Sequence, residues 1–210
     1  MSAKILFITG TDTGVGKSLV SSLLVRNMRD RGIHCCGLKP IETGCEQKPS
    51  GTVTNGSTVT KDSTVTAADA ELLRAAGGNR QTLDEVLLYS FRSPLAPLAA
   101  ARIEERQIPW EALCRKTREL ADRCELLIVE GAGGLLVPIA EELTFADYAR
   151  DCGAKVLLVV GSRLGCINHT LLSLELLQHR QLPTLGYVLN EGLSGDPENN
   201  TDRNSTASDC

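Results

Sequence analysis

Residues 10–18 have the sequence Gly-Thr-Asp-Thr-Gly-Val-Gly-Lys-Ser, and this stretch decides the fold of the chain. It follows an apolar run at 5–8 that predicts a buried strand, and it precedes leucines and valines between 19 and 25 at helical spacing. A strand, a glycine-rich turn and a helix in this order form a cradle for a polyphosphate, because backbone N–H groups and the helix N-terminus all face the anion. We therefore expect Lys17 to reach the β and γ oxygens of a nucleotide and Ser18 to ligate Mg²⁺.

The spacing of glycines indicates a longer variant of this phosphate-binding loop. The usual pattern has glycine five residues before Gly16, where this chain has Thr11. Gly10 lies one position earlier. The alternative interpretation, a glycine-rich turn with an incidental lysine, is disfavoured by the order of strand, loop and helix.

Composition narrows the class of protein. A chain of 210 residues with 42% hydrophobic and only 3% aromatic residues suits one α/β domain whose core is mostly aliphatic. A net charge of −4 argues against a nucleic-acid binder. No apolar run approaches the ~20 residues that would cross a membrane. The first residues lead straight into a strand without a signal peptide, so we expect a cytoplasmic protein.

The cysteines do not predict a metal centre. None of the eight forms a C-x-x-C pair, and the cluster at Cys35, Cys36 and Cys45 has the wrong spacing for zinc. Several lie inside apolar segments. Reduced and mostly buried thiols are therefore the better interpretation.

Strands and helices alternate along residues 1–190, which predicts a single domain. The expected fold is α/β, with three layers: a mostly parallel sheet and helices on both faces. The expected strands are 5–8, 34–38, 86–90, 126–129, 155–160 and 184–189, and the expected helices are 19–25, 67–76, 96–106, 109–123 and 167–180. A Ser/Thr-rich segment predicts a flexible insertion at about 45–66, and the polar tail 191–210 is expected to be disordered.

Several candidate groups follow strands, and ligands bind beyond the carboxyl ends of strands in such sheets. Glu130 follows an apolar run, which favours a Mg²⁺ ligand beside the phosphate loop. Asp69 could be a metal ligand or could simply complement a helix dipole. Lys39 could be an ordinary exposed lysine, but Pro40 should end its strand there and place it near a transferring phosphoryl group. The segment 161–168 enters a helix through glycines, and its N–H groups could bind an anion or merely begin that helix.

Six segments together resemble the dethiobiotin synthetase family, from about residue 4 to residue 190. They are Thr9–Ser18 (TGTDTGVGKS), Lys39–Gly44 (KPIETG), Ala68–Ala70 (ADA), Ser93-Pro94, Glu130–Gly134 (EGAGG) and Gly165–His169 (GCINH). The resemblance implies a homodimer with a P-loop NTPase fold. It also implies ATP-dependent carboxylation of 7,8-diaminononanoate (diaminopelargonate) by CO₂ and ring closure to dethiobiotin, with ADP and phosphate as by-products in biotin biosynthesis.

The resemblance also implies roles for individual residues. Lys39 and Lys17 match catalytic lysines, and Ser18, Asp69 and Glu130 match metal ligands. The ATP-binding positions are Gly14, Val15, Gly16, Lys17, Ser18, Leu19, Asp69, Glu130, Gly131, Ala132, Gly133, Asn190 and Glu191. The diamine positions are Thr43 and, from the partner subunit, Gly165, Cys166, Ile167 and Asn168.

Two departures from the family pattern keep alternatives open. Gly14 stands where some members have glutamate, and after Asn190 the family normally continues with a strand and a proline-containing loop that helps to enclose adenine. Weak or poorly selective nucleotide binding is the resulting expectation. One alternative is a regulatory ATPase of the partition or cluster-carrier type, disfavoured because the early loop lysine of that class is missing. The other is a non-catalytic relative.

Overall fold

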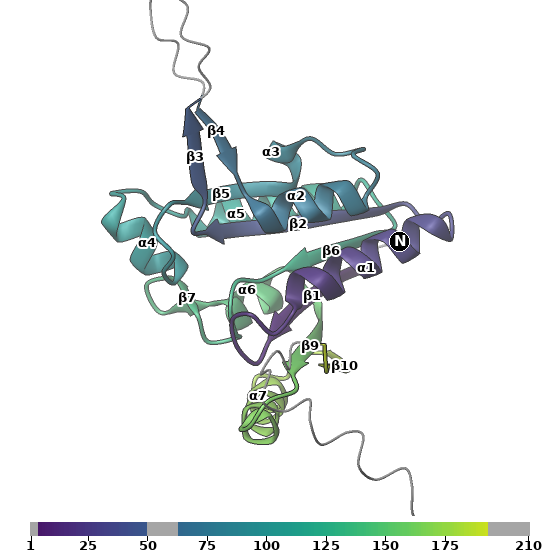
Figure 1. The fold of residues 1–210 in the computed structure, drawn as a ribbon. Coiled ribbons are helices and arrows are strands. Elements are labelled where there is room, and N and C mark those ends of the chain that lie inside the picture. The colour runs from purple at the N-terminus through teal and green to yellow at the C-terminus, as the bar shows by residue number, and fades with distance from the viewer. Residues whose placement is uncertain (1–3, 50–62, 193–210) are drawn as a thin grey trace, which may run out of the picture.

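A computed structural model describes residues 4–49 and 63–192 (Figure 1). The strands are β1 (Lys4–Gly10), β2 (Cys35–Thr43), β3 (Glu46–Pro49), β4 (Ser63–Thr66), β5 (Leu87–Phe91), β6 (Leu126–Glu130), β7 (Pro138–Ala140), β8 (Leu143–Thr144), β9 (Lys155–Gly161) and β10 (Thr184–Asn190). The helices are α1 (Lys17–Asp30), α2 (Ala68–Ala76), α3 (Leu83–Val86), α4 (Pro97–Ile103), α5 (Trp110–Ala121), α6 (Phe145–Asp151) and α7 (Cys166–His179).

The central sheet has six strands in the order β10-β9-β1-β6-β2-β5. Every neighbouring pair in it is parallel, and β1 lies between β6 and β9. Parallel neighbours need crossover connections, and these supply the helices. The carboxyl ends of β1, β2 and β6 therefore come together at one edge.

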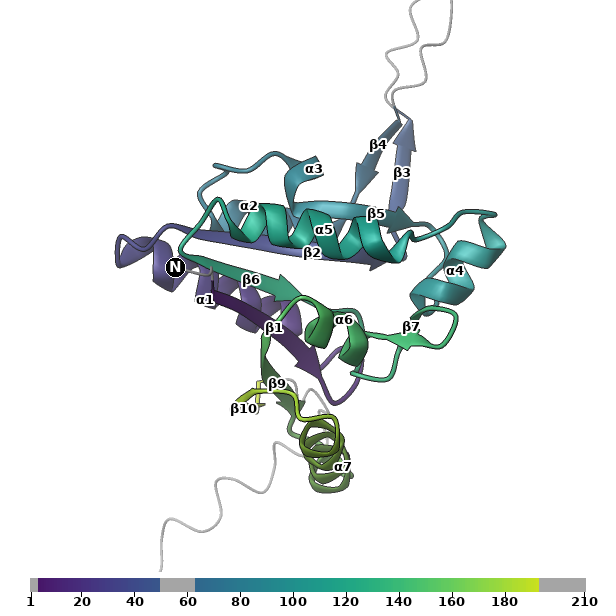
Figure 2. The same cartoon turned by 180° about the vertical axis from the view of Figure 1, so that it is seen from behind.

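Helices cover both faces of this sheet, so the predicted three-layer α/β fold is confirmed (Figures 1 and 2). On one face, Val25 of α1 and Leu73 of α2 pack with Ile8 and Ile128 of the sheet. The opposite face is covered by α5, α6 and α7. Its core is less purely aliphatic than expected, because the rings of Phe7, Phe145 and Tyr148 stack or meet edge-on at 5.9–6.3 Å.

Strand β2 runs past the proline that was expected to end it, and that expectation is wrong. Leu38 is the last residue paired with β6, whereas pairing with β5 continues to Thr43. Beyond Leu38 the strand has a hydrogen-bonded neighbour on one side only, and Pro40 is tolerated there without the loss of a ladder bond. Lys39 consequently lies inside the strand, not at its end.

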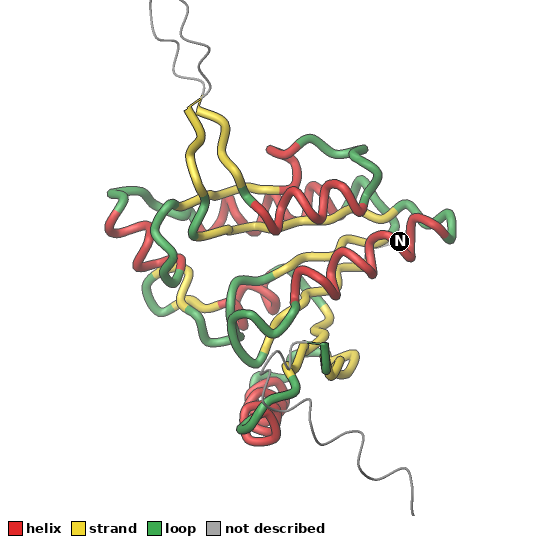
Figure 3. Tube along the Cα trace, in the orientation of Figure 1, coloured by secondary structure: helices red, strands yellow, loops and turns green. Residues whose placement is uncertain are grey.

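Two antiparallel pairs lie outside the central sheet, and neither was expected. The first joins β3 to β4 and extends away from the sheet (Figure 3). Its strands belong to the segment 45–66 that was expected to be a flexible insertion, and residues 50–62 of that segment lie outside the described residues. The second joins β7 to β8. Of the polar tail, residues 193–210 also lie outside the described part of the chain.

The cysteines in the described ranges are free thiols, as the sequence indicated: Cys35, Cys36, Cys45, Cys114, Cys124, Cys152 and Cys166. None of the helices in those ranges combines the length and apolar character needed to cross a bilayer.

Candidate active site

A cavity of about 700 Å³ opens where β1, β2 and β6 end. Its lining brings together segments that are far apart in the sequence: Thr13, Gly14, Gly16, Lys17, Ser18, Lys39, Glu42, Thr43, Asp69, Pro94, Leu95, Ala96, Pro97, Ala132, Gly133 and Val137. Five of the segments that carry the family resemblance contribute to it.

The phosphate loop has the backbone that its glycines predict. Gly14 and Gly16 have φ values of 73° and 94°, which residues with a Cβ rarely adopt. A Cβ on Gly10 would lie 2.6 Å from Val15 Cγ2 and 2.8 Å from the Asp12 carbonyl oxygen, so the loop needs glycine at this earlier position. Helix α1 starts at Lys17 with no side-chain cap and no acidic residue in its first turn. Its N-terminal N–H groups are therefore suited to an anion.

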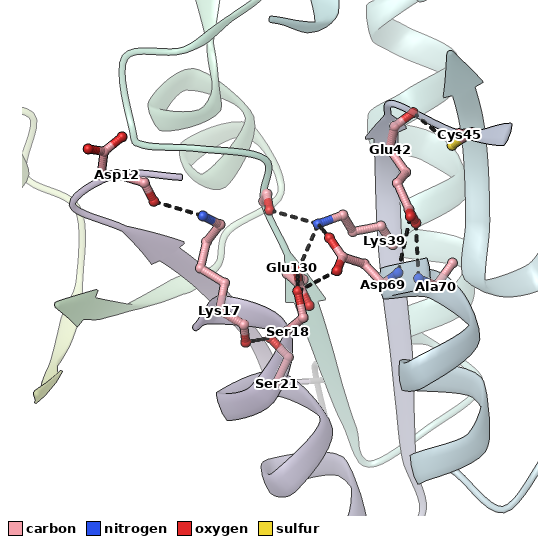
Figure 4. A network of polar contacts seen from close by, with 11 residues as sticks. Asp12, Lys17, Ser18, Ser21, Lys39, Glu42, Cys45, Asp69, Ala70 and Glu130 are labelled. Carbon is pink, nitrogen blue, oxygen red and sulfur yellow. Dashed lines mark hydrogen bonds and ion pairs between the residues drawn. The ribbon is translucent and has the colours of Figure 1, made fainter. Parts of the chain in front are cut away.

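Lys17 lies in this loop with its ammonium group largely buried. Its Nζ donates a hydrogen bond to the Asp12 carbonyl oxygen at 2.9 Å (Figure 4). The Asp12 carboxylate pairs with Arg163. Burial, together with the positive charge of Lys39, lowers the pKa of Lys17 to about 8. A polyphosphate in the loop would supply the negative charge that this ammonium lacks.

Four side chains form one polar network beside the loop (Figure 4). The Ser18 hydroxyl lies 2.6 Å from Asp69 Oδ1 and 2.7 Å from Glu130 Oε1, and its single proton can go to either carboxylate. Lys39 Nζ donates to Asp69 Oδ2 and to Glu130 Oε1, both at 2.7 Å, and to the Gly131 carbonyl oxygen at 3.2 Å. Strand β2, the end of β6 and helices α1 and α2 therefore meet through these groups.

Charge keeps Lys39 and Asp69 of this network ionised despite their burial. Lys39 is 2% exposed and Glu130 is fully buried. Burial alone would lower the pKa of Lys39, but the charges of Glu130 and Asp69 outweigh it and raise that pKa above its ordinary value. Burial would likewise raise the pKa of Asp69, but Lys39 and the Ser18 hydrogen bond bring it below its ordinary value. Lys39 therefore stays positive and Asp69 negative at neutral pH.

The carboxylates fit a magnesium ion. Among the described residues, nothing donates a hydrogen bond to Glu130 Oε2, although this oxygen is buried. An unpartnered buried carboxylate oxygen costs free energy, which a cation would offset. Mg²⁺ usually takes one or two carboxylates and leaves its other positions to water and phosphate oxygens. Asp69 and Glu130 match that number, and no third His, Cys, Asp or Glu joins them within the described chain.

Comparison with known proteins gives the family. A family model described as an AAA domain matches residues 4–207. The ATP-dependent dethiobiotin synthetase of Anaeromyxobacter dehalogenans strain 2CP-C is 43% identical over 194 residues, which cover 91% of this chain and 79% of that protein. The chain belongs to the dethiobiotin synthetase family. The synthetase of Thermodesulfovibrio yellowstonii is 37% identical over 191 residues, covering 88% of this chain and 74% of that protein.

Two solved structures of other proteins have low similarity to this chain. The kinase domain of the Escherichia coli tyrosine kinase ETK has a TM-score of 0.48 at 19% identity and covers 90% of this chain and 68% of that one. A ParA family ATPase from Chlorobium tepidum has a TM-score of 0.46 at 15% identity and covers 90% and 74%. These values add nothing to the assignment.

The remaining residues that the dethiobiotin synthetase resemblance implied lie in three places. Thr43 lines the cavity together with Lys39. Asn190, at the end of β10, donates from Nδ2 to the carbonyl oxygen of Val15 at 3.1 Å, and Glu191 follows it. The 165–168 turn begins α7 and does not contribute to the lining of this cavity.

One residue at the site was missed by the sequence reasoning. Glu42 is 6% exposed and accepts hydrogen bonds from the backbone N–H groups of Asp69 and Ala70. Burial raises the pKa of Glu42, although these two N–H groups and the charge of Lys39 oppose the shift. The sequence offered only the position of this carboxylate three residues after Lys39, and nothing local indicated its contact with α2.

Proposed function

We propose that the cavity at the ends of β1, β2 and β6 is the active site of an ATP-dependent dethiobiotin synthetase. Family membership gives the enzyme class and its place in biotin biosynthesis. The observation that carries the assignment of the site is the meeting of Lys17, Ser18, Lys39 and Asp69 in the lining of one cavity. Behind that lining, the buried Glu130 carboxylate bonds Ser18 and Lys39.

The reaction places a specific demand on the two lysines. One amine of 7,8-diaminononanoate combines with CO₂ to give a carbamate, whose oxygen attacks the γ-phosphorus of ATP and releases ADP. The second amine then attacks the carbonyl carbon of the mixed anhydride, closes the ureido ring and expels phosphate. Negative charge moves across the transferring phosphoryl group, and fixed cations stabilise such a transition state. Lys17 and Lys39 are the buried cations of the cavity and suit this role.

We assign the divalent cation to Ser18, Asp69 and Glu130. Bound there, Mg²⁺ would neutralise charge on the β- and γ-phosphates. Two observations support this choice of ligands. Among the described residues the buried Glu130 Oε2 has no hydrogen-bond partner, and the Asp69 and Glu130 carboxylates both lie beside the Ser18 hydroxyl. Lys39 contacts both carboxylates in the described structure, so it would remain beside the ion and the phosphoryl group.

We assign the rest of the nucleotide to 14–19 and 130–133, with the base toward Asn190 and Glu191. The hydrogen bond from Asn190 to Val15 supports this, because it ties the end of β10 to the phosphate loop. Thr43 is assigned to the diamine, since it lines the same cavity one strand residue beyond Glu42.

We further propose a homodimer that completes the diamine site. Near the start of α7, Leu164, Ile167, Leu171 and Leu172 are 104%, 75%, 58% and 57% exposed. A contiguous apolar face of this kind is typical of an interface. A second copy packed there could bring the turn 165–168 to the cavity of its partner, where helix N–H groups would bind the substrate carboxylate.

ATP use and free thiols also suit a cytoplasmic location.

Phosphate release tests this function. The protein is incubated with ATP, Mg²⁺ and bicarbonate, with and without 7,8-diaminononanoate. We expect release only when the diamine is present. Equal phosphate release with and without the diamine would instead indicate a regulatory ATPase. No phosphate release in either mixture would indicate a non-catalytic relative.

A further inference from the structure

Helix α2 lacks a cap of its own. Its N-cap position is Ala67, which has no side-chain oxygen, and no side chain near in sequence makes a capping hydrogen bond. The first N–H groups of a helix need acceptors when they are buried. For α2 the acceptor comes from another element: Glu42 of β2 accepts from the N–H of Asp69 at 3.1 Å and from that of Ala70 at 3.0 Å.

The residue held in this way is itself part of the site. Asp69 turns its backbone N–H toward Glu42 and its carboxylate toward Ser18 and Lys39 (Figure 4). Glu42 Oε1 and Oε2 each accept one N–H group, so the carboxylate holds two successive residues of the helix. Hydrogen bonds to a carboxylate are stronger than those between neutral groups. The first turn of α2 is therefore fixed against β2, the strand that carries Lys39.

Burial makes this contact rigid. Glu42 is 6% exposed, and Ala67 and Ala70 on either side of Asp69 are fully buried. The Cys45 thiol donates to the Glu42 carbonyl oxygen at 3.6 Å, which adds a backbone contact after the strand. Asp69, by contrast, has a side chain that is 36% exposed, and its carboxylate is held by Ser18 and Lys39 and by the position of its own backbone.

We propose that Glu42 is a positioning residue: by capping α2 from β2, it sets the place of the Asp69 carboxylate for the divalent cation. This inference rests on the proposed metal ligands. A group that orients a metal ligand typically changes metal affinity by about 10–100-fold when it is removed. Loss of Glu42 should therefore weaken cation binding although Glu42 does not touch the cation.

The test measures cation binding directly, without turnover. Mn²⁺ serves as a spectroscopic probe for Mg²⁺, and its binding in the presence of a non-hydrolysable ATP analogue is followed by electron paramagnetic resonance. We expect Glu42→Ala to raise the Mn²⁺ dissociation constant about tenfold or more. Glu42→Gln keeps one carbonyl oxygen that can accept an N–H group, and we expect it to recover part of that loss. Should Glu42→Ala fail to fold, Glu42→Gln decides alone, with an expected rise of about twofold or more.

Glu71→Gln is the matched control. Glu71 also carries negative charge in the first turn of α2, but its carboxylate bonds Arg74 and not the backbone of Asp69. The Glu71→Gln variant should bind Mn²⁺ with the same affinity as the unsubstituted protein. If Glu71→Gln weakens Mn²⁺ binding as much as the Glu42 substitutions do, the cause would be the loss of negative charge and not the loss of the cap. That result would overturn the proposal.

Three further outcomes separate this inference from the proposed function. Unchanged Mn²⁺ affinity in the Glu42 variants, with tight binding to the unsubstituted protein, overturns the inference and leaves the metal ligands in place. A raised KM for the diamine with unchanged Mn²⁺ affinity would also overturn it, because Glu42 would then bind substrate. If the unsubstituted protein binds no Mn²⁺ with the nucleotide, the metal assignment and the inference both fail.

Discussion

Replacing Lys39 by methionine should separate stability from catalysis. Lys39 is 2% exposed and lies 2.7 Å from both Asp69 Oδ2 and Glu130 Oε1. Lys39→Met keeps most of the side-chain volume but leaves the fully buried Glu130 carboxylate without its cation. Removal of one partner of a buried ion pair costs about 3–5 kcal/mol of unfolding free energy. Because the Asp69 side chain is 36% exposed and can be hydrated, we expect a value near ~3 kcal/mol.

A second variant checks the cause of this loss. In Lys39→Met/Glu130→Gln the fully buried charge is also removed, and at least ~2 kcal/mol of the lost stability should return. Turnover should not return, because the cation beside the phosphoryl group is still missing and the proposed Mg²⁺ ligand Glu130 has been changed as well. Loss of such a cation alone costs about 100-fold or more in kcat.

Urea unfolding gives the free energies, followed by circular dichroism and by the fluorescence of Trp110. Phosphate release in the presence of the diamine gives kcat. If Lys39→Met unfolds within ~1 kcal/mol of the unsubstituted protein, the ion network does not stabilise the fold as this reasoning requires. If the double variant is no more stable than Lys39→Met, the unpaired Glu130 charge is not the cause.

Three other predictions follow from the same geometry. Lys17 has a pKa of about 8 without ligand, and bound phosphates favour its charged form. ATP affinity measured by calorimetry should therefore fall about tenfold between pH 7 and pH 9, because the free protein loses that proton over this range. An affinity that is the same at both pH values would contradict a contact between Lys17 and the phosphates. Gly10→Ala places a Cβ 2.6 Å from Val15 Cγ2, so the unfolding free energy should fall by about 1–3 kcal/mol and ATP should bind more weakly. Unchanged stability would show that the loop can move aside. Ile167→Asp should make the protein monomeric in light scattering and raise the KM for the diamine, and an unsubstituted protein that is itself monomeric would refute the proposed interface.

Local sequence patterns were enough to predict the layers of the fold and much of its candidate site. The apolar run, the glycines and Lys17-Ser18 predicted β1, the loop and α1, because each depends on residues close in sequence. For the same reason Glu130 could be predicted to lie beside the loop, where it contacts Ser18; its role as a metal ligand stays a prediction. The order of the strands depends on pairing between distant segments, which no local pattern contains, and this is also why β2 extends beyond Pro40.

Two features that were not predicted from the sequence were missed for different reasons. Helix α6 had a local signal, because Thr144 and Asp147 form a capping box at its start. The contact of Glu42 with α2 had none, since it joins a strand to the N-terminus of a helix 27 residues further along the chain.

The central claim is that the residues of this cavity catalyse the incorporation of one CO₂ carbon into the diamine, with conversion of one ATP to ADP and phosphate. The most direct measurement uses ¹³C-bicarbonate, ATP, Mg²⁺ and 7,8-diaminononanoate, with mass spectrometry of the product and a phosphate assay on the same sample. We predict dethiobiotin with ¹³C at its ureido carbonyl, one phosphate for each product molecule, and loss of both in Lys17→Ala. Phosphate release without labelled product, or full labelled product from Lys17→Ala, would contradict the account.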